Sequence, residues 1–382
     1  MDAATDDLPV QSQQQNRAMT AAEERYYLAS QWQLMWRKFR KHRLAVAAAV
    51  VLGMFYLVAA TYEFWQPHPT TAQYDGFLSA PPTTIHFFDE EGNFRGPFIY
   101  AMTNELNLET FTREYVEDRS EMYPIRFFTR GAPYKLWGAI ESDLHFIGVE
   151  GDAKLFLLGS DMLGRDLFSR VLAGSRISLS IGLIGVFLSF VLGCVLGGIS
   201  GYFGGLIDLV IQRIIEFLIS LPTTPLWLAL SAAVPARWPP VQVYFAITVI
   251  LSIFGWAGLA RVVRGKLLEL REYDYVTAST LAGATHSHII GSHLLPGFMS
   301  YLIVHLTLAI PGMILAETAL SFLGLGIRPP AVSWGTLMQD AQNVRSIAVQ
   351  PWMLTPGLFV IVAVLMFNFV GDGLRDAADP YK

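Results

Sequence analysis

The feature that most constrains this chain is a set of long apolar runs, the clearest of which covers residues 44–62 without a charged side chain. At a rise of about 1.5 Å per residue, a helix of that length crosses a hydrocarbon layer roughly 30 Å thick. The other runs cover residues 177–200, 206–230, 241–259, 301–323 and 354–370. We therefore expect an α-helical membrane protein with six transmembrane helices.

The overall composition agrees with the apolar runs. The chain is 53% hydrophobic and 15% charged, whereas an average soluble domain is about 25% charged. The formal net charge of −5 gives no electrostatic reason to expect a nucleic-acid partner. The single cysteine, Cys194, excludes a disulfide framework within the chain and a cysteine-based metal cluster.

Basic residues set the expected orientation in the membrane, because cytoplasmic loops carry an excess of Lys and Arg. Five of the seven residues 37–43 are Lys or Arg, and four more basic residues lie within 261–271, after the fourth run. Both clusters fall on one side if there are six spans and the N-terminus is inside. We therefore expect both termini to be cytoplasmic.

The spans divide the chain into four parts. Residues 1–43 form a cytoplasmic tail with a basic interfacial helix, 44–62 the first span, and 63–176 an external insert with the segment leading into the second span. Residues 177–382 form the core, with an inner loop at 264–298. The strand-like runs of the insert predict a small β or α+β module; they cover residues 83–88, 94–102, 124–128 and 154–160.

The sequence carries no recognisable catalytic or phosphate-binding motif. Gly265-Lys266-Leu267 fails the phosphate-loop pattern, because position 260 is Ala and position 267 is neither Ser nor Thr. His286, His288 and His293 are close in sequence, but no fourth ligand or carboxylate is near, so we interpret them as exposed polar residues. We expect no catalytic residue, no metal and no cofactor in this chain.

Ionisable residues inside the spans have two interpretations. Glu317 and His305 lie in the fifth run, and an intramembrane ionisable residue is a candidate for a functional pathway. The interpretation we favour for Glu317 is a bond to a neighbouring helix. Arg213 and Glu216, at i and i+3, are expected to neutralise each other and to face the bundle rather than lipid.

Small residues recur every fourth position from the second run into the following turn, at Gly193, Gly197, Gly201 and Gly205. This spacing puts small residues on one helix face and predicts close packing against another helix.

The inner loop reads EYDYVTASTLAGATHSHIIGSHLLP from Glu272 to Pro296. It resembles the loop that marks permease subunits of ABC importers, whose pattern is E-A-A, three residues, G, nine residues and I-x-L-P. Thr277-Ala278-Ser279 take the E-A-A places, Gly283 the glycine place and His293 the isoleucine place. Thr for Glu and Ser for the second Ala are departures from the pattern, which bear on the acidic contact to the ATPase.

Three further segments, 158–182, 319–341 and 367–380, are similar to the oligopeptide/dipeptide/nickel family, and in particular to its second, C-type permease. The long insert at 66–154 departs from that family, and its role is not implied by the resemblance.

The resemblance implies a type I ABC importer permease fold in the bacterial inner membrane, with no enzymatic site of its own. It implies a second permease subunit, two cytoplasmic ATP-binding subunits that hold ATP and Mg, a periplasmic binding protein and surrounding lipid. It also implies contact with the ATPase through a coupling helix formed by Glu272, Asp274, Tyr275, Thr277, Ala278, Ser279, Gly283 and Ala284.

Several alternatives remain at this stage. The family favours peptide cargo, but oligosaccharides, opines and nickel are also carried by related systems. An ion-coupled secondary transporter would use Glu317, and a membrane sensor would use the outer module. The insert either contacts the binding protein, caps the pathway or only stabilises the fold.

Overall fold

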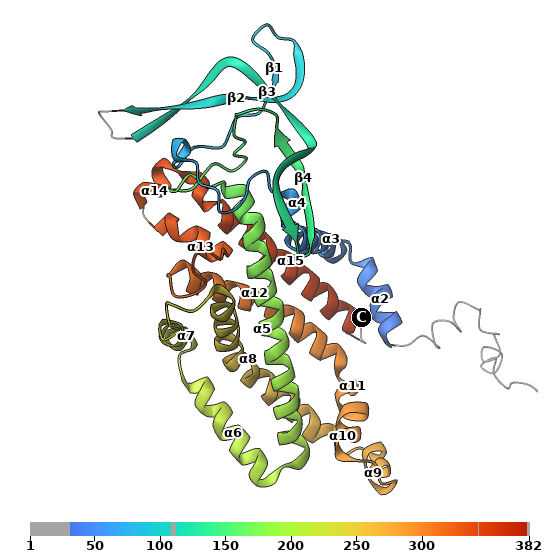
Figure 1. Ribbon diagram of the computed structural model, residues 1–382. Coiled ribbons are helices and arrows are strands. Elements are labelled where there is room, and N and C mark those ends of the chain that lie inside the picture. The colour runs from blue at the N-terminus through green and yellow to red at the C-terminus, as the bar shows by residue number, and fades with distance from the viewer. Residues whose placement is uncertain (1–30, 108–111, 343, 380–382) are drawn as a thin grey trace, which may run out of the picture.

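The computed structural model describes residues 31–107, 112–342 and 344–379. Within these ranges five helices are long and apolar enough to cross a membrane, and they run side by side (Figure 1). They are α3 (Arg43–Ala60), α5 (Leu167–Phe203), α8 (Pro240–Leu270), α12 (Met299–Phe322) and α15 (Thr355–Ala378), the last preceded by the short η5 (Pro351–Leu354). The helical membrane architecture expected from the sequence is confirmed.

The third predicted span, 206–230, is not one helix. The structure has α6 (Gly205–Ser220) and α7 (Thr223–Ala232), separated at Leu221 and Pro222. Proline has no N–H to donate and clashes with the preceding turn, so Pro222 ends α6. The prediction of a single span rested on apolar composition, which does not reveal this break.

Two helix ends also differ from the prediction. α5 begins at Leu167 rather than 177, because Asp166 caps it and accepts the N–H of Ser169 at 2.9 Å. The predicted boundary at 176 therefore falls inside a helix. α8 continues to Leu270, beyond the predicted end at 259.

α5 and α8 pack closely along the glycine face predicted from the sequence. A Cβ built on Gly197 would lie 2.5 Å from the backbone oxygen of Ala260, and one on Gly201 would lie 2.7 Å from that of Arg264. Gly205 lies outside this contact, at the start of α6. The prediction of close helix packing is confirmed for this pair.

The main apolar core lies between α3, α5, α8, α12 and α15. Trp334, at the start of α13 (Trp334–Met338), is fully buried in it, and its ring lies 6.3 Å from that of Phe55 and 6.4 Å from that of Phe359. The short helix α13, outside the spans, thereby contributes a large side chain to the core of the bundle. Beyond α13, the connection runs through η4 (Gln339–Gln342) and α14 (Val344–Val349) to α15.

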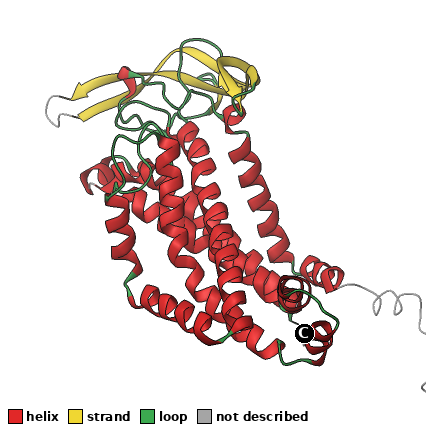
Figure 2. Ribbon diagram, turned by 60° about the horizontal axis from the view of Figure 1, so that its bottom comes forward, coloured by secondary structure: helices red, strands yellow, loops and turns green. Residues whose placement is uncertain are grey.

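The insert is a four-stranded antiparallel sheet with strand order β1-β2-β3-β4 (Figure 2). The strands are β1 (His86–Phe88), β2 (Phe94–Asn107), β3 (Thr112–Leu136) and β4 (Ile140–Val149). The first half of β3 pairs with β2 and the second half with β4. The run 154–160 predicted as a strand is largely loop, whereas β4, whose sequence mixes polar and apolar residues, was missed. Two short elements connect this sheet to the bundle, α4 (Tyr62–Trp65) and η2 (Asp75–Phe77).

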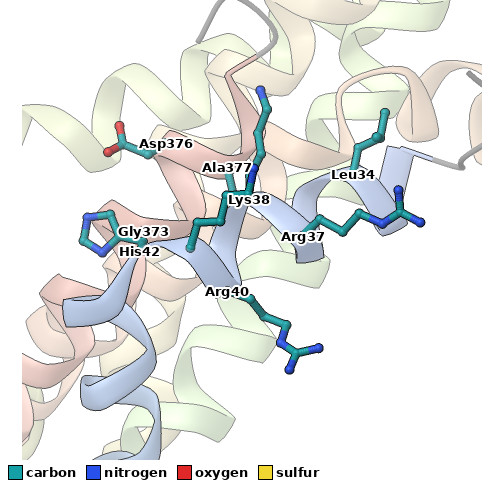
Figure 3. A pocket seen from close by; sticks show the side chains of 9 residues that line it. Leu34, Arg37, Lys38, Arg40, His42, Gly373, Asp376 and Ala377 are labelled. Atoms are coloured by element: carbon teal, nitrogen blue, oxygen red, sulfur yellow. The ribbon is translucent and has the colours of Figure 1, made fainter. Parts of the chain in front are cut away.

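The predicted basic interfacial helix is α2 (Gln31–Lys41), which lies across the end of α15 (Figure 3). Met35 and Phe39 are its buried residues, and Lys38 donates to the backbone oxygen of Asp379 at 2.8 Å. Arg37 and Arg40 are exposed. One apolar face and one basic face are what a helix at a membrane surface requires.

Candidate functional site

The loop between α8 and α12 folds into short helical pieces at the end of the bundle remote from the sheet (Figure 1). They are α9 (Asp274–Leu281), α10 (His286–His288), the π-helical turn η3 (Ile289–Leu294) and α11 (Leu295–Gly297). The predicted loop at 264–298 therefore begins inside α8.

α9 presents most of its surface to solvent. Val276 is the one buried residue among its eight, all of which the structure describes. Leu281 at the end of the helix is 84% exposed. The exposed residues of the predicted coupling set are Glu272, Asp274, Tyr275, Thr277, Ala278 and Gly283, while Ser279 and Ala284 are half-buried. The structure thus brings the predicted residues together on one exposed element.

Gly283 ends α9 in a left-handed conformation, with φ +80°. Its N–H donates to the oxygen of Thr280 at 3.0 Å, and the N–H of Ala284 donates to that of Ser279 at 3.1 Å. This is a common helix ending that favours glycine. A Cβ at Gly283 would have no described atom within 4 Å, so a larger residue there meets backbone strain rather than a clash.

A hollow of about 500 Å³ separates α9 from the end of α5. At its side, the hydroxyl of Tyr202 lies 2.9 Å from Nδ1 of His286. His288 contacts Ser292 at 3.3 Å, and the His293 ring packs on that of Tyr275. Within the described part of the chain, no three His, Cys, Asp or Glu side chains are grouped to hold a metal.

An ion pair joins three helices just above the loop. Asp208 of α6 accepts from Nε and Nη2 of Arg264 of α8, both at 2.5 Å, and from the hydroxyl of Ser200 of α5 at 2.5 Å. The side chains of Arg264 and Asp208 are 29% and 16% exposed, so both are half-buried. This pair was missed from the sequence. The signal was an acid inside the apolar run 206–230, because a carboxylate in a membrane span requires a partner, although Glu216 lies in the same run.

Arg213 and Glu216 form the predicted pair, with Nη1 and Oε2 2.8 Å apart. Their side chains are 74% and 54% exposed, so they do not face the helices of this chain. That they face a bundle rather than lipid stays a prediction. α6 has one buried residue, Ile215, and most of its other residues are exposed.

A cavity of about 170 Å³ lies between α5, α7, α8 and α12. His305 lines it, and its ring stacks on that of Tyr301 with ring centroids 6.1 Å apart. The other polar or aromatic residues of the lining are Ser189, Phe190 and Trp227. Trp227 was missed from the sequence, because its role depends on the break that separates α7 from α6.

Glu317 is fully buried away from the lining of this cavity. Ser178 of α5 donates to Oε2 at 3.0 Å, and Ser321, one turn along α12, donates to Oε1 at 2.7 Å. The same Ser178 oxygen accepts the N–H of Trp334 at 3.1 Å. Glu317 therefore bonds a neighbouring helix, as the favoured interpretation had it.

At the sheet end of the bundle, Asp161 organises the segment before α5. Its Oδ1 accepts the N–H groups of Leu163 at 2.9 Å and Arg165 at 3.0 Å. Its Oδ2 accepts from Nε of Arg165 at 2.7 Å and from Arg170. This carboxylate is nearly fully buried and closes the turn into α5.

Asp166 is buried beside that turn. Burial raises its pKa to about 7, against the opposing effect of its bonds from Ser169. The hydroxyl of Ser169 also accepts the N–H of His68 at 3.3 Å. Burial lowers the pKa of His68 to about 4, so its ring is neutral at pH 7. The turn therefore connects the segment that follows the first span to the start of the second span.

Comparisons with known proteins match this architecture. Residues 193–381 match the family described as the inner membrane component of binding-protein-dependent transport systems, and residues 30–82 match the N-terminal transmembrane domain of oligopeptide transport permease C.

Two curated relatives illustrate the match. The dipeptide transport system permease protein DppC of Bacillus subtilis is 31% identical over 347 residues, 90% of this chain and 84% of the relative. The oligopeptide transport system permease protein OppC of Haemophilus influenzae is 40% identical over 223 residues, 58% of this chain and 69% of the relative. With both family models arranged along a bundle of membrane-spanning helices, the chain belongs to the family of inner-membrane permeases of binding-protein-dependent ABC importers.

Proposed function

We propose that this chain is the C-type permease of an ATP-driven peptide importer, and that α9 is the element through which the ATPase subunits act on it. The observation that carries the proposal is the exposure of α9, which displays the coupling residues around one buried anchor, Val276. An exposed helix with Leu281 and Tyr275 at its surface, preceded by the exposed Tyr273, is suited to contact with another protein.

The packing beneath α9 supports the proposal that a displacement of this helix moves the bundle. Val276 lies in one apolar cluster with Val263 and Leu267 of α8 and with Ile289 and Leu294 of η3. The Asp208–Arg264 pair continues this connection to α5 and α6. A displacement of α9 is therefore expected to move the ends of several helices as one body.

The second permease is expected to cover α6. An exposed Arg213–Glu216 pair in a helix of the membrane region is costly against hydrocarbon. Contact with a second subunit, or with an aqueous pathway between the two, removes that cost. We propose the same assembly for the other partners, with two cytoplasmic ATP-binding subunits, a periplasmic binding protein and both termini of this chain in the cytoplasm.

ATP and Mg are proposed to bind to the ATPase subunits, so that this chain takes part in transport without a catalytic site or cofactor. The proposed cargo is a peptide, on the similarity to permeases named for dipeptides and oligopeptides. Oligosaccharides, opines or nickel are the competing cargo classes.

The test is uptake by liposomes that contain the complete transporter and its binding protein. ATP-dependent accumulation of a labelled dipeptide is expected, with no accumulation when the ATPase subunits are omitted. Uptake driven by an ion gradient without those subunits would show a secondary transporter instead. Accumulation of a labelled oligosaccharide or nickel but no peptide would overturn the cargo assignment.

A glycine pair tests the role of α9 in the same assay. Gly283→Trp is expected to reduce uptake while ATP hydrolysis continues, because the α9 ending changes at the proposed contact. Gly265→Trp is the matched control, since this glycine is also exposed and free of neighbours within 4 Å. Normal uptake by the Gly283 variant would contradict the assignment of α9.

A further inference from the structure

The turn of the β3–β4 hairpin is apolar and exposed. It reads Leu-Trp-Gly-Ala-Ile over residues 136–140, with Trp137 64% and Ile140 56% exposed. Hairpin turns that face water favour Asn, Asp and Gly, because polar side chains satisfy the turn backbone and stay hydrated. An uncharged turn with an exposed tryptophan therefore indicates an apolar environment rather than water.

A hydrogen bond fixes the height of this turn against the membrane. The indole N–H of Trp137 donates to the backbone oxygen of Ala60 at 2.8 Å, and Ala60 is the last residue of α3. The 18 residues of α3 rise roughly 27 Å, close to the thickness of a hydrocarbon core. The end of α3, and Trp137 with it, therefore lies at one boundary of that core. Figure 1 shows the hairpin reaching down to this end of α3.

The surface on both sides of the turn continues the same apolar character. Leu57 and Met54, in the last two turns of α3, are exposed. On the hairpin, Phe128 is exposed and its ring lies 5.7 Å from that of Phe146 and 6.2 Å from that of Phe64 in α4. Aromatic side chains are enriched at this level of membrane proteins.

Charged side chains begin directly above the turn. Lys135 and Glu141 form an ion pair of 2.9 Å, and both are exposed. Farther up the hairpin, Arg130 lies 3.8 Å from Asp143. The hairpin is therefore apolar at its tip and charged along its arms, which matches the change from hydrocarbon to headgroups across a membrane interface.

We propose that the turn 136–140 inserts into the interfacial layer of the lipid bilayer and holds the insert at a fixed height and tilt over the bundle. The occupant of this surface is lipid, because the turn is continuous with the lipid-facing side of α3 and is fixed to the end of that helix. The opposite end of the sheet offers a comparison: Phe94 is 69% exposed on the β1–β2 hairpin, far from the helix ends (Figure 1).

The test measures the surroundings of a spin label in the full transporter in phospholipid nanodiscs. The label is attached at Ile140→Cys in a Cys194→Ala background, and at Phe94→Cys as the matched control. We expect the label at 140 to collide more often with oxygen, and severalfold less often with a water-soluble nickel complex, than the label at 94. Equal nickel accessibility at the two sites overturns the proposal. Shielding of position 140 from both reagents also overturns it and shows a protein covering the turn.

A second substitution tests the anchor itself. Trp137→Ser, added to the labelled Ile140→Cys protein, removes both the indole and its bond to Ala60. Nickel accessibility at position 140 is expected to rise toward that at position 94, while the complex elutes unchanged in gel filtration. No rise in an intact complex would overturn the role of Trp137 in holding the turn in lipid.

Discussion

The two ends of the helix bundle are held in different ways. At the sheet end, buried polar groups close on one another: Asp161 accepts four bonds, and Glu317 accepts two hydroxyls from two helices. At the loop end, α9 is held by one buried side chain, Val276, and the Asp208–Arg264 pair that joins α6 to α8 keeps partial exposure. Dense buried networks resist opening, whereas segments with few buried contacts open at low cost.

This difference indicates which end of the bundle moves at the lower cost in free energy. A load applied to α9 is expected to shift the loop ends of α5, α6 and α8, while the sheet ends stay in place and act as the pivot. Rigid elements that rotate about a fixed contact are a common form of switching. Substitutions at the two ends of the bundle are expected to have effects of different size.

The largest effect is expected at the loop end. Val276→Asp places a carboxylate in the apolar cluster under α9, and an unpaired buried charge is costly enough to displace the helix. Uptake in proteoliposomes is expected to fall at least tenfold, with the transporter still assembled in the membrane. Ser287→Asp adds the same charge at an exposed position of the loop and should retain uptake. Equal uptake by both variants would show that the anchor is not needed.

The second largest effect is expected at the sheet end, where a substitution lowers the stability of the protein. Glu317→Leu removes the acceptor of two buried hydroxyls, those of Ser178 and Ser321. Leaving a buried polar group without a partner costs about 1–3 kcal/mol each, so the thermal unfolding temperature in detergent should fall by several degrees.

Glu317→Gln separates this structural role from ion coupling. An amide is isosteric and keeps an oxygen acceptor for one of the two hydroxyls, so uptake is expected to stay within about twofold of the wild type. An ion-coupled mechanism needs the carboxylate and predicts loss of uptake even where the protein remains folded.

A smaller effect is expected from the ion pair at the loop end. Asp208→Asn leaves Arg264 without its carboxylate partner, and we expect a loss of about 1–3 kcal/mol in the free energy of unfolding, below that of a fully buried pair because both groups keep some exposure. Double substitution with Arg264→Gln should recover part of this loss. Strictly additive losses in thermal unfolding would mean that the two side chains act independently.

Much of this arrangement could be predicted from the sequence. The apolar runs locate the membrane helices, although α5 and α8 extend well beyond their runs, and the glycine spacing identifies the face of α5 that approaches α8. The position of the coupling loop follows from its motif, which is local. What failed was set by single residues, namely Pro222, which divides the third span, and Asp166, which starts α5 ten residues early.

The pairings across helices could not be predicted in the same way. Asp208 and Arg264 are 56 residues apart, and Glu317 and Ser178 are 139 apart. Nothing in a single sequence states which distant polar groups share a buried site. The insert was harder still, because β4 has no clear alternation and its place depends on pairing with the long β3.

The smallest effect concerns pH and the sheet end. The pKa of Asp166 is raised above its ordinary value of 3.8, to about 7, by burial. The protonated carboxyl is thus favoured in the folded state, so its stabilisation is complete below pH 3.8 and is lost as pH rises through 7. One such group changes the free energy of unfolding by at most about 1.4 kcal/mol per pH unit. Asp166→Asn keeps a capping oxygen for Ser169 and should weaken this fall between pH 5 and 8.

Asp89→Asn is the control for that measurement, because Asp89 is a half-buried carboxylate of the insert and its pKa is lowered by the backbone N–H of Asn93 and the side chain of Arg95. The stabilisation from a lowered carboxyl pKa is present above the ordinary value and disappears only in acid, so this variant should leave the slope near neutral pH unchanged. Thermal unfolding of the two variants and the wild type across that range compares them directly. Identical slopes for all three would mean that Asp166 is charged in the folded protein at neutral pH, and the sheet end would then hold an uncompensated buried charge rather than a closed network.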